Sequence, residues 1–171
     1  MKRKFKRIHL LVFMVLSIMI AGCSSNEDVM TKAVEELEYD VLVPSYIPAE
    51  FELEQVIYEG DLFLLTYSNA DNTSYVEISQ RQYARALHSE RLLEYTEKGV
   101  DPYEANPDLS YQMIDNFVGE YKLNDHVNGL NLSYEFIPAI PKTEIDWYPF
   151  YRIVSVGIDE EEFQKVIKSL E

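Results

Sequence analysis

The stretch LFLLTYSNADNTSYVEISQ, residues 62–80, contains two strand-like runs separated by a polar loop. The first run, 62–67, is apolar on both faces, so we expect it to lie centrally in a sheet. The second run covers 75–80, and the intervening Ser, Asn, Asp and Thr residues at 68–74 favour a loop. The stretch therefore predicts two neighbouring strands of a larger sheet.

Further strand-like runs lie on both sides of this stretch. Residues 51–58 precede it and are joined to it by a tight connection at Glu59-Gly60-Asp61. In 130–137, apolar and aromatic residues alternate with polar ones, which is typical of a half-buried strand. The remaining predicted strands are 111–114, 118–123 and 147–156.

Three helices are predicted around these strands. Residues 27–37 have acids in the first turn and an apolar stripe formed by Met30, Ala33, Val34 and Leu37. Residues 82–98 are helical in character and end before Gly99. Near the C-terminus Asp159 is the predicted N-cap, with Glu162 three residues later as in a capping box. That last helix has a stripe formed by Phe163, Val166, Ile167 and Leu170.

This order of elements predicts the α+β class. We expect a curved, half-barrel-like antiparallel sheet with helices on one face: an N-terminal helix, an inserted helix and a C-terminal helix. Without residues 1–22 the chain has 171 − 22 = 149 residues, enough for one domain with its own core. We therefore predict a tether at 23–28 and a single domain at 29–171, with an insertion at 82–109.

Residues 1–22 have the plan of a signal peptide. Five Lys and Arg residues between 2 and 7 precede an almost unbroken apolar run at 10–20. A permanent membrane span needs about 20 apolar residues, so this run is short for one. The basic cluster stays in the cytoplasm, so the chain beyond the apolar run is predicted to be exported.

Ile20-Ala21-Gly22-Cys23 resembles a bacterial lipobox. The resemblance implies that cleavage occurs after Gly22, and that Cys23 becomes an N-terminal diacylglyceryl cysteine. Fatty chains such as palmitate would then anchor the protein in the cell membrane on its extracytoplasmic face, stably once two or more are attached. An uncleaved signal anchor and ordinary secretion are the alternatives. Because Cys23 is the only cysteine, the fold has no internal disulfide.

The predicted mature chain is strongly acidic. It has 15 − 5 = 10 Lys and Arg against 30 Asp and Glu, a formal net charge of −20. Such a chain repels nucleic acid and anionic lipid headgroups, so we expect no nucleic-acid partner. The charge keeps the protein soluble and away from an anionic membrane; a basic partner or a cation is the alternative role.

Three segments resemble a family of domains of unknown function found in bacterial lipoproteins and in sigma-factor regulators. They are VPSYIPAEFELEQV (43–56), LFLLTYSNADNTSYVEISQ (62–80) and WYPFYRIVSVGIDEEEFQKVIKSL (147–170). That family is similar to the half-barrel of the lipoprotein carriers LolA and RseB, so the resemblance implies a curved sheet whose concave face can hold acyl chains. Glu50 departs from the family's usual glycine, and 82–109 is longer than the family needs.

The sequence contains no recognisable catalytic or metal-binding constellation. His88 and His126 lie in polar segments, and no Gly-x-Ser-x-Gly motif presents a nucleophile for them. The chain has no HExxH motif and no cysteine pair for zinc. Asp101, Glu104 and Asp108 do not match the calcium-loop spacing. We therefore predict no enzyme activity, no metal and no cofactor.

Aromatic residues on the predicted strands are the remaining candidates for a site. One set would face the helices as core, and the other could line a groove for an apolar ligand or a partner's peptide. The candidate groove residues are Tyr67, Tyr75, Tyr134, Phe136, Trp147 and Tyr151. The alternative is that both sets are packing residues.

These observations support three functional hypotheses. The first is a non-catalytic binding or sensing lipoprotein for an apolar ligand or an envelope partner. The second is a structural or regulatory lipoprotein that meets a basic partner through its acidic surface or the 82–109 insertion. The third is a hydrolase with an unrecognised site.

Overall fold

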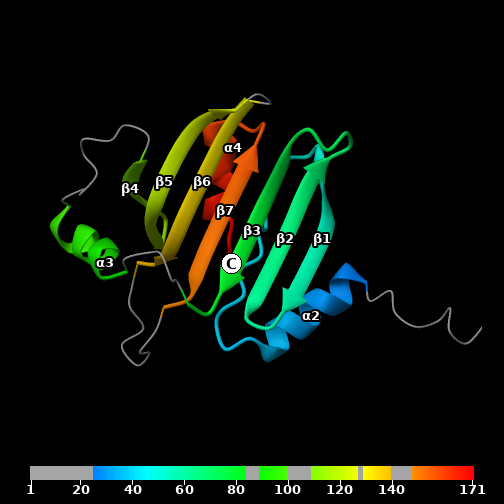
Figure 1. The fold of residues 1–171 in the computed structure, drawn as a ribbon, viewed down its shortest axis with the longest axis horizontal. Coiled ribbons are helices and arrows are strands. Elements are labelled where there is room, and N and C mark those ends of the chain that lie inside the picture. The colour runs from blue at the N-terminus through cyan, green and yellow to red at the C-terminus, as the bar shows by residue number, and fades with distance from the viewer. Residues whose placement is uncertain (1–24, 84–88, 100–108, 127–128, 140–147) are drawn as a thin grey trace, which may run out of the picture.

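The computed structural model describes residues 25–83, 89–99, 109–126, 129–139 and 148–171. In that part of the chain, seven strands form one open, antiparallel sheet in the order β1-β2-β3-β7-β6-β5-β4 (Figure 1). With an N-terminal, an inserted and a C-terminal helix, this is the predicted α+β fold, which is confirmed. The strands are β1 (Phe51–Glu59), β2 (Leu62–Asn69), β3 (Tyr75–Arg81), β4 (Leu109–Ile114), β5 (Phe117–His126), β6 (Gly129–Pro138) and β7 (Phe150–Val156). The helices are α2 (Asn26–Glu36), α3 (Ser89–Lys98) and α4 (Glu160–Lys168).

The stretch 62–80 forms the hairpin β2–β3, but β2 is not the central strand. It is second from one edge, between β1 and β3, and the middle position belongs to β7. Its outward side chains, Leu62 and Leu64, are half-buried, and Leu64 is directly opposite Ile57 of β1. A cross-strand neighbour therefore gives Leu64 part of the cover that a central position would have provided.

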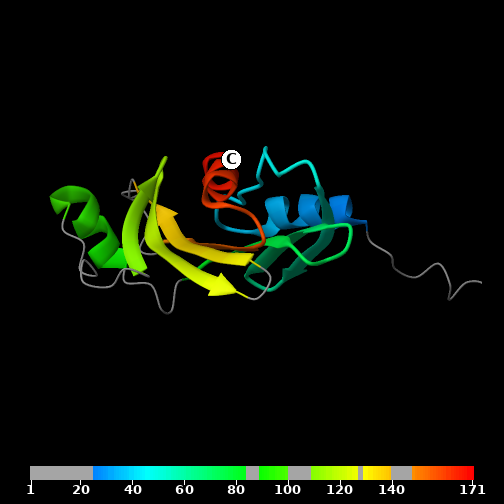
Figure 2. The same ribbon diagram turned by 90° about the horizontal axis from the view of Figure 1, so that it is seen from above.

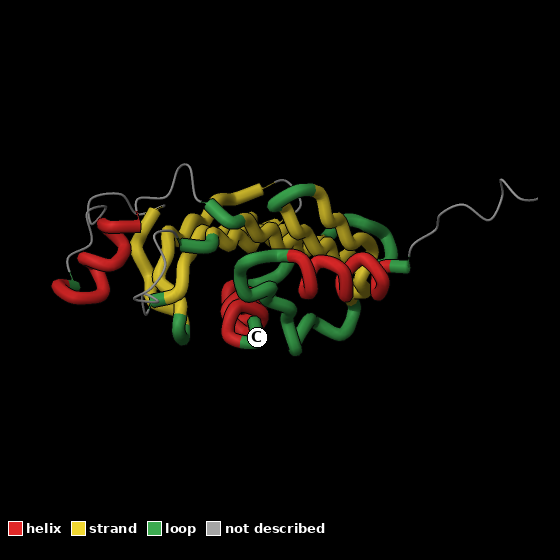
Figure 3. The backbone as a smooth tube through the Cα atoms, turned by 90° about the horizontal axis from the view of Figure 1, so that it is seen from below, coloured by secondary structure: helices red, strands yellow, loops and turns green. Residues whose placement is uncertain are grey.

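The sheet curls around α4. In Figure 2, β4 and β5 bend toward the side on which α4 lies, and α2 is on the same side; Figure 3 shows this arrangement from below. Phe163, Val166 and Ile167 of α4 are fully buried in one cluster with the concave side chains of the strands. Gly119 permits a close approach in this curl, since a Cβ there would lie 2.3 Å from the Glu135 carbonyl oxygen.

The inserted helix lies on the opposite, convex face, so the expectation that all helices share one face is wrong for α3. Leu92 of α3 is buried in a separate cluster with Tyr111, Val118 and Ile137. These strand residues point away from the concave core because their neighbours in sequence point into it. Both faces of β4, β5 and β6 are therefore apolar where α3 covers them.

The first helix begins earlier than predicted. Ser25 is its N-cap and forms a capping box with Asp28, so only residues 23 and 24 of the predicted tether precede the capped helix. Of its predicted apolar stripe, Ala33 is buried, whereas Val34 is 57% exposed. Val29 takes the place of Val34 in packing against the core.

A strap, residues 39–46, crosses from α2 to β1 beside α4. The Gln80 side chain accepts from the Leu42 N–H at 2.8 Å and donates to the Leu42 carbonyl at 2.6 Å. The Tyr151 hydroxyl donates to the Asp40 carbonyl at 2.8 Å. Pro44 forms an isolated bridge with Leu170, which joins the strap to the end of the chain. Helices α2 and α4 and the strap together cover the concave face (Figure 2).

Candidate functional site

The most prominent feature outside the core is a group of glutamates along β1, an edge strand of the sheet. Glu50 precedes β1, and Glu52 and Glu54 lie in its first half. The pairing of β1 with β2 shifts between Leu53 and Gln55, which leaves Glu54 as an extra residue in a β-bulge. A charged, bulged edge strand resists pairing with other chains, so this strand is suited to contacts through side chains.

The β2–β3 loop faces these glutamates. The Asn69 side chain accepts from the Ser74 N–H at 3.1 Å, and the Asp71 carboxylate accepts from the Thr73 N–H at 3.1 Å and hydroxyl at 2.6 Å. These bonds hold the loop in one shape. The two bonds from Thr73 also lower the pKa of Asp71 below its ordinary value, which keeps this carboxylate charged.

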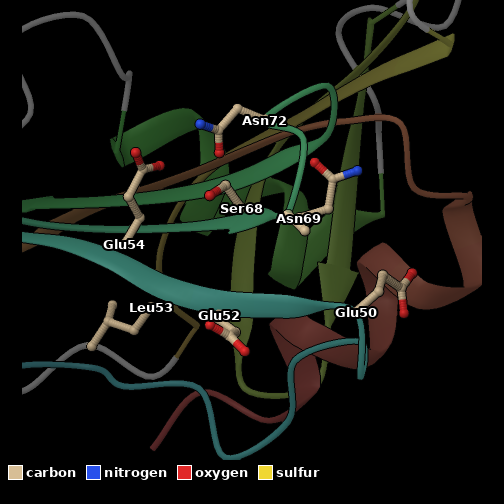
Figure 4. A pocket seen from close by; sticks show the side chains of 8 residues that line it. Glu50, Glu52, Leu53, Glu54, Ser68, Asn69 and Asn72 are labelled. Atoms are coloured by element: carbon tan, nitrogen blue, oxygen red, sulfur yellow. The ribbon is translucent and has the colours of Figure 1, made fainter.

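The glutamates and the loop enclose an open pocket of about 270 Å³. Figure 4 shows the side chains around it, from the start of β1, the end of β2 and the loop after β2. Its charged groups are carboxylates and its other polar groups are amides and a hydroxyl. The lining residues are Glu50, Glu52, Leu53, Glu54, Ser68, Asn69, Ala70 and Asn72.

A second pocket, of about 260 Å³, lies where α2 ends and β1 turns into β2. It is lined by Glu36, Leu37, Glu38, Tyr39, Gly60, Asp61 and Gln82. The Tyr58 hydroxyl donates to Glu36 at 3.1 Å, and Gln82 donates to Glu38 at 2.9 Å. Desolvation and the bond to Glu36 raise the pKa of Tyr58, so it remains a neutral donor.

The acidic residues that line both pockets belong to one acidic segment, residues 26–61. It contains eleven Asp and Glu residues and a single cation, Lys32. All eleven acidic residues are exposed. Lys32 lies 4.0 Å from Glu36 and 5.7 Å from the centre of the Tyr58 ring. The segment therefore presents a net formal charge of 1 − 11 = −10 to solvent, and a positively charged group is the chemistry that it would attract.

The candidate groove residues lie in different places. Tyr134, Phe136 and Tyr151 are at most 2% exposed, and with Tyr67 they form part of the concave core. Tyr134 and Phe136 stack on each other with ring centres 4.8 Å apart. Tyr75 of β3 is directly opposite Ser68 of β2 and Val156 of β7, and its side chain lies on the convex side of the sheet. Trp147 lies outside the described residues.

The buried members of this set are packing residues in the structure. An apolar ligand could reach Tyr134 or Tyr151 only if α4 and the strap moved away, because these elements cover that face. Burial raises the pKa of the Tyr134 hydroxyl, which donates to the carbonyls of Gln112 at 2.9 Å and Phe117 at 3.1 Å. The neutral Tyr134 hydroxyl therefore links β6 to the backbones of β4 and β5.

Several other sequence candidates fall outside the described residues. These are the lipobox residues Ile20, Ala21, Gly22 and Cys23, together with His88, Asp101, Glu104 and Asp108. His126 is the last residue of β5. Within the described ranges, no three His, Cys, Asp or Glu residues are grouped as metal ligands, and no helix there is long and apolar enough to cross a bilayer.

Comparisons with known proteins assign no family. No family model matches the chain, and no curated protein matches it. One crystal structure, of a protein from Bacteroides thetaiotaomicron, is similar with a TM-score of 0.39 and 18% identity. The match covers 72% of this chain and 42% of that protein, so this chain spans less than half of that protein's length. The resemblance to the lipoprotein-carrier half-barrel therefore remains a prediction.

Residue-level prediction missed the glutamates of β1. The alternation Glu50-x-Glu52-x-Glu54 and the excess of acid over 26–61 are both visible in the sequence. Acids are frequent along the whole chain, however, so the sequence does not indicate that these three line one pocket. The bulge and the β2–β3 loop create that pocket.

Proposed function

We propose that this protein is a lipid-anchored, extracytoplasmic lipoprotein that binds a basic partner protein of the cell envelope and catalyses no reaction. The observation that supports the binding role is the acidic segment. It has eleven exposed carboxylates and contains one cation, Lys32; Arg81 of β3 pairs with one of these carboxylates, Asp61, at 3.9 Å, and two open pockets lie at the border of the segment. Such a surface favours a cationic partner by increasing its association rate and by repelling anionic competitors.

Anchoring is the second part of the proposal, and it is supported by the leader and the lipobox at 20–23. Attachment to the membrane would confine the domain to a thin layer beside the bilayer. A weak charge-based contact then gains from the raised local concentration of partners in the same layer. The proposal therefore needs no tight interface.

The buried aromatic residues favour this role over binding of an apolar ligand. An acyl chain entering the concave face would have to displace Phe163, Val166 and Ile167, all fully buried. It would also have to break the bonds between Gln80 and Leu42. The acidic segment needs no such rearrangement, because its carboxylates are already exposed.

Photo-crosslinking in intact cells tests the binding role. A photoreactive amino acid at Ala70, which is exposed and lines the pocket of Figure 4, should capture an envelope protein with a basic surface. Capture should fall with rising salt. It should also fall in the variant Glu50→Gln/Glu52→Gln/Glu54→Gln.

A matched control removes three exposed acids elsewhere, in the variant Glu97→Gln/Asp115→Asn/Glu171→Gln. This control removes the same number of negative charges, three, so capture should persist in it. Equal loss in both variants would show a non-specific charge effect and contradict the proposed site. A co-purifying lipid with no salt-sensitive crosslink would instead favour the apolar-ligand hypothesis.

A further inference from the structure

The distance between the predicted lipid anchor and the folded domain is short. The Ser25 N–H donates to the Asp28 carboxylate at 3.1 Å, and the Asp28 N–H donates to the Ser25 hydroxyl at 3.2 Å. Ser25 therefore belongs to the first turn of α2, and only Ser24 separates it from Cys23. Two residue steps of extended chain span at most about 7 Å. An acyl anchor on Cys23 would hold the start of α2 at the membrane surface.

The anchored point lies at one end of the molecule. Figure 1 places the longest axis horizontally, with α2 and β1 toward one end and α3 at the other. Helix α2 contacts β1, the edge strand, and α3 contacts β4 and β5 at the opposite edge. Six interstrand spacings separate β1 from β4, which corresponds to about 29 Å across the sheet. The two edges can therefore differ widely in height above a bilayer.

Charge decides between two orientations of the anchored domain: upright, with only the α2–β1 edge near the bilayer, and flat, with both edges of the sheet near it. The acidic segment accounts for −10 of the −20 of the predicted mature chain, so the rest of the chain also contributes −10. The anchor forces the first group of charges toward the lipid phosphates. Lying flat would bring the second group there as well, whereas standing upright keeps its charges on β4, β5, β6 and α3 beyond the screening length of about 8 Å at physiological salt. Repulsion from an anionic bilayer therefore favours the upright orientation.

We propose that the domain stands upright on an anionic bilayer, with its α2–β1 edge next to the headgroups and its β4–α3 edge furthest from them. This inference rests on the proposed lipidation of Cys23. It also restricts the partner, because a protein that binds the acidic segment must reach it beside the membrane surface. The β4–α3 edge is the part of the domain displayed outward.

Single labelling positions at the two edges test this orientation. Lipidation uses the only cysteine thiol of the chain, so one introduced cysteine is the only labelling site. Glu27→Cys places a fluorophore in the first turn of α2, and Glu97→Cys places it in α3. The two variants are matched, because each replaces an exposed helical glutamate and removes one negative charge.

The full-length protein is produced in a host that lipidates it, labelled, and reconstituted into phosphatidylglycerol-containing vesicles with a contact-range quencher on the headgroups. We expect several-fold stronger quenching at position 27 than at position 97. High salt should reduce the difference, since screening permits the domain to tilt. Equal quenching, stronger quenching at 97, or no quenching at either position would overturn the orientation.

Mass spectrometry of the same preparation separates the two proposals. If Cys23 is lipidated and quenching is equal, only the orientation is wrong and the anchored binding role remains. If Cys23 is unmodified, the proposed anchoring is wrong, and the orientation derived from it is wrong too.

Discussion

The two faces of the sheet are covered by very different parts of the chain. The concave face is covered by α2, α4 and the strap, and its side chains form one large core. On the convex face, α3 covers a smaller cluster at the β4–β5 side. Beyond α3 this face presents charged groups, where Lys122 and Arg152 both lie within 3.8 Å of Glu135.

This difference shows what decides whether a strand residue becomes core. Tyr134 and Glu135 are neighbours in β6, and each belongs to a row of side chains on its own face. The row with Tyr134 is buried because α4 lies on it. In the other row Ile137 is buried beneath α3, whereas Glu135 is paired with cations and reaches solvent. The position of the helices, rather than the alternation itself, assigns the faces. Substitutions on the two faces test this contrast, from the largest expected effect to the smallest.

Phe163→Ala should have the largest effect. Phe163 is fully buried on α4, and its ring lies 6.0 Å from that of Tyr121 on β5. Deleting a buried Phe ring leaves a cavity, so the free energy of unfolding should fall by about 3–5 kcal/mol in urea denaturation. Lys168→Ala, an exposed change on the same helix, should alter it by less than about 0.5 kcal/mol. Similar values for both variants would contradict the role of α4 in the concave core.

Leu92→Ala should have a smaller and more local effect. Leu92 is fully buried, but in the convex cluster, so its loss should lower the free energy of unfolding by about 2–3 kcal/mol. Amide hydrogen exchange should increase in α3, β4 and β5, and protection in β1 and β2 should be retained. Equal loss of protection across all seven strands would show that the two faces unfold as one unit.

Gln80→Leu tests the attachment of the strap to the concave face. The change leaves the N–H and the carbonyl of Leu42 without the side-chain amide that now satisfies both. We expect a loss of about 1–2 kcal/mol in thermal or urea unfolding, and faster hydrogen exchange within residues 39–46. Ser79→Ala, on the convex side of the same strand, is the control. Unchanged exchange in the strap would mean that other contacts hold it.

A smaller effect should come from Glu162→Gln, and it should depend on pH. Hydrogen bonds from Lys165 and Tyr46 lower the pKa of Glu162 below its ordinary value of 4.5. A carboxyl with a lowered pKa in the folded state stabilises the fold above its unfolded-state pKa, and this contribution is lost as the pH falls through the folded-state value. The melting temperature of the variant should therefore be slightly lower than that of the natural protein at about pH 7. The difference between the two melting temperatures should disappear at pH values well below 4.5.

Glu94→Gln, the counterpart on the convex face, should have the smallest effect. Lys98 lowers the pKa of Glu94 in the same way, but this pair lies within α3 alone. Glu162 also joins α4 to the strap through Tyr46. The melting temperature should therefore respond less to Glu94→Gln than to Glu162→Gln; the reverse order would contradict the contrast between the faces.

Local elements were the most predictable part of the fold. Asp159 caps α4 as expected, since its carboxylate accepts from the Glu162 N–H at 2.8 Å. The capping box predicted there is incomplete in its second half, because the Glu162 side chain bonds Tyr46 and Lys165. The complete capping box lies at Ser25 and Asp28. A cap depends on residues three positions apart, whereas a competing tertiary partner such as Tyr46 cannot be identified from that spacing.

The candidate site was less predictable than the fold. Aromatic residues on strands suggested a groove, but Tyr134 and Phe136 are core, because α4 occupies the space in front of them. The acidic character of the surface was expected from the net charge. The pocket that gathers Glu50, Glu52 and Glu54 depends on a bulge that the sequence does not indicate.

The sequence by itself determined the approximate positions of the strands and helices, the cap of α4 at Asp159, the acidic surface and the prediction of a lipidated leader. Each of these depends on residues near one another in the chain, where periodicity, turn chemistry and charge act directly. Only the tertiary structure decided that α2 and α4 cover one face, that α3 covers the other, and that β7 is the central strand. These choices depend on side chains far apart in sequence, such as Gln80 and Leu42 or Phe163 and Tyr121, which fit together only once the sheet has curled.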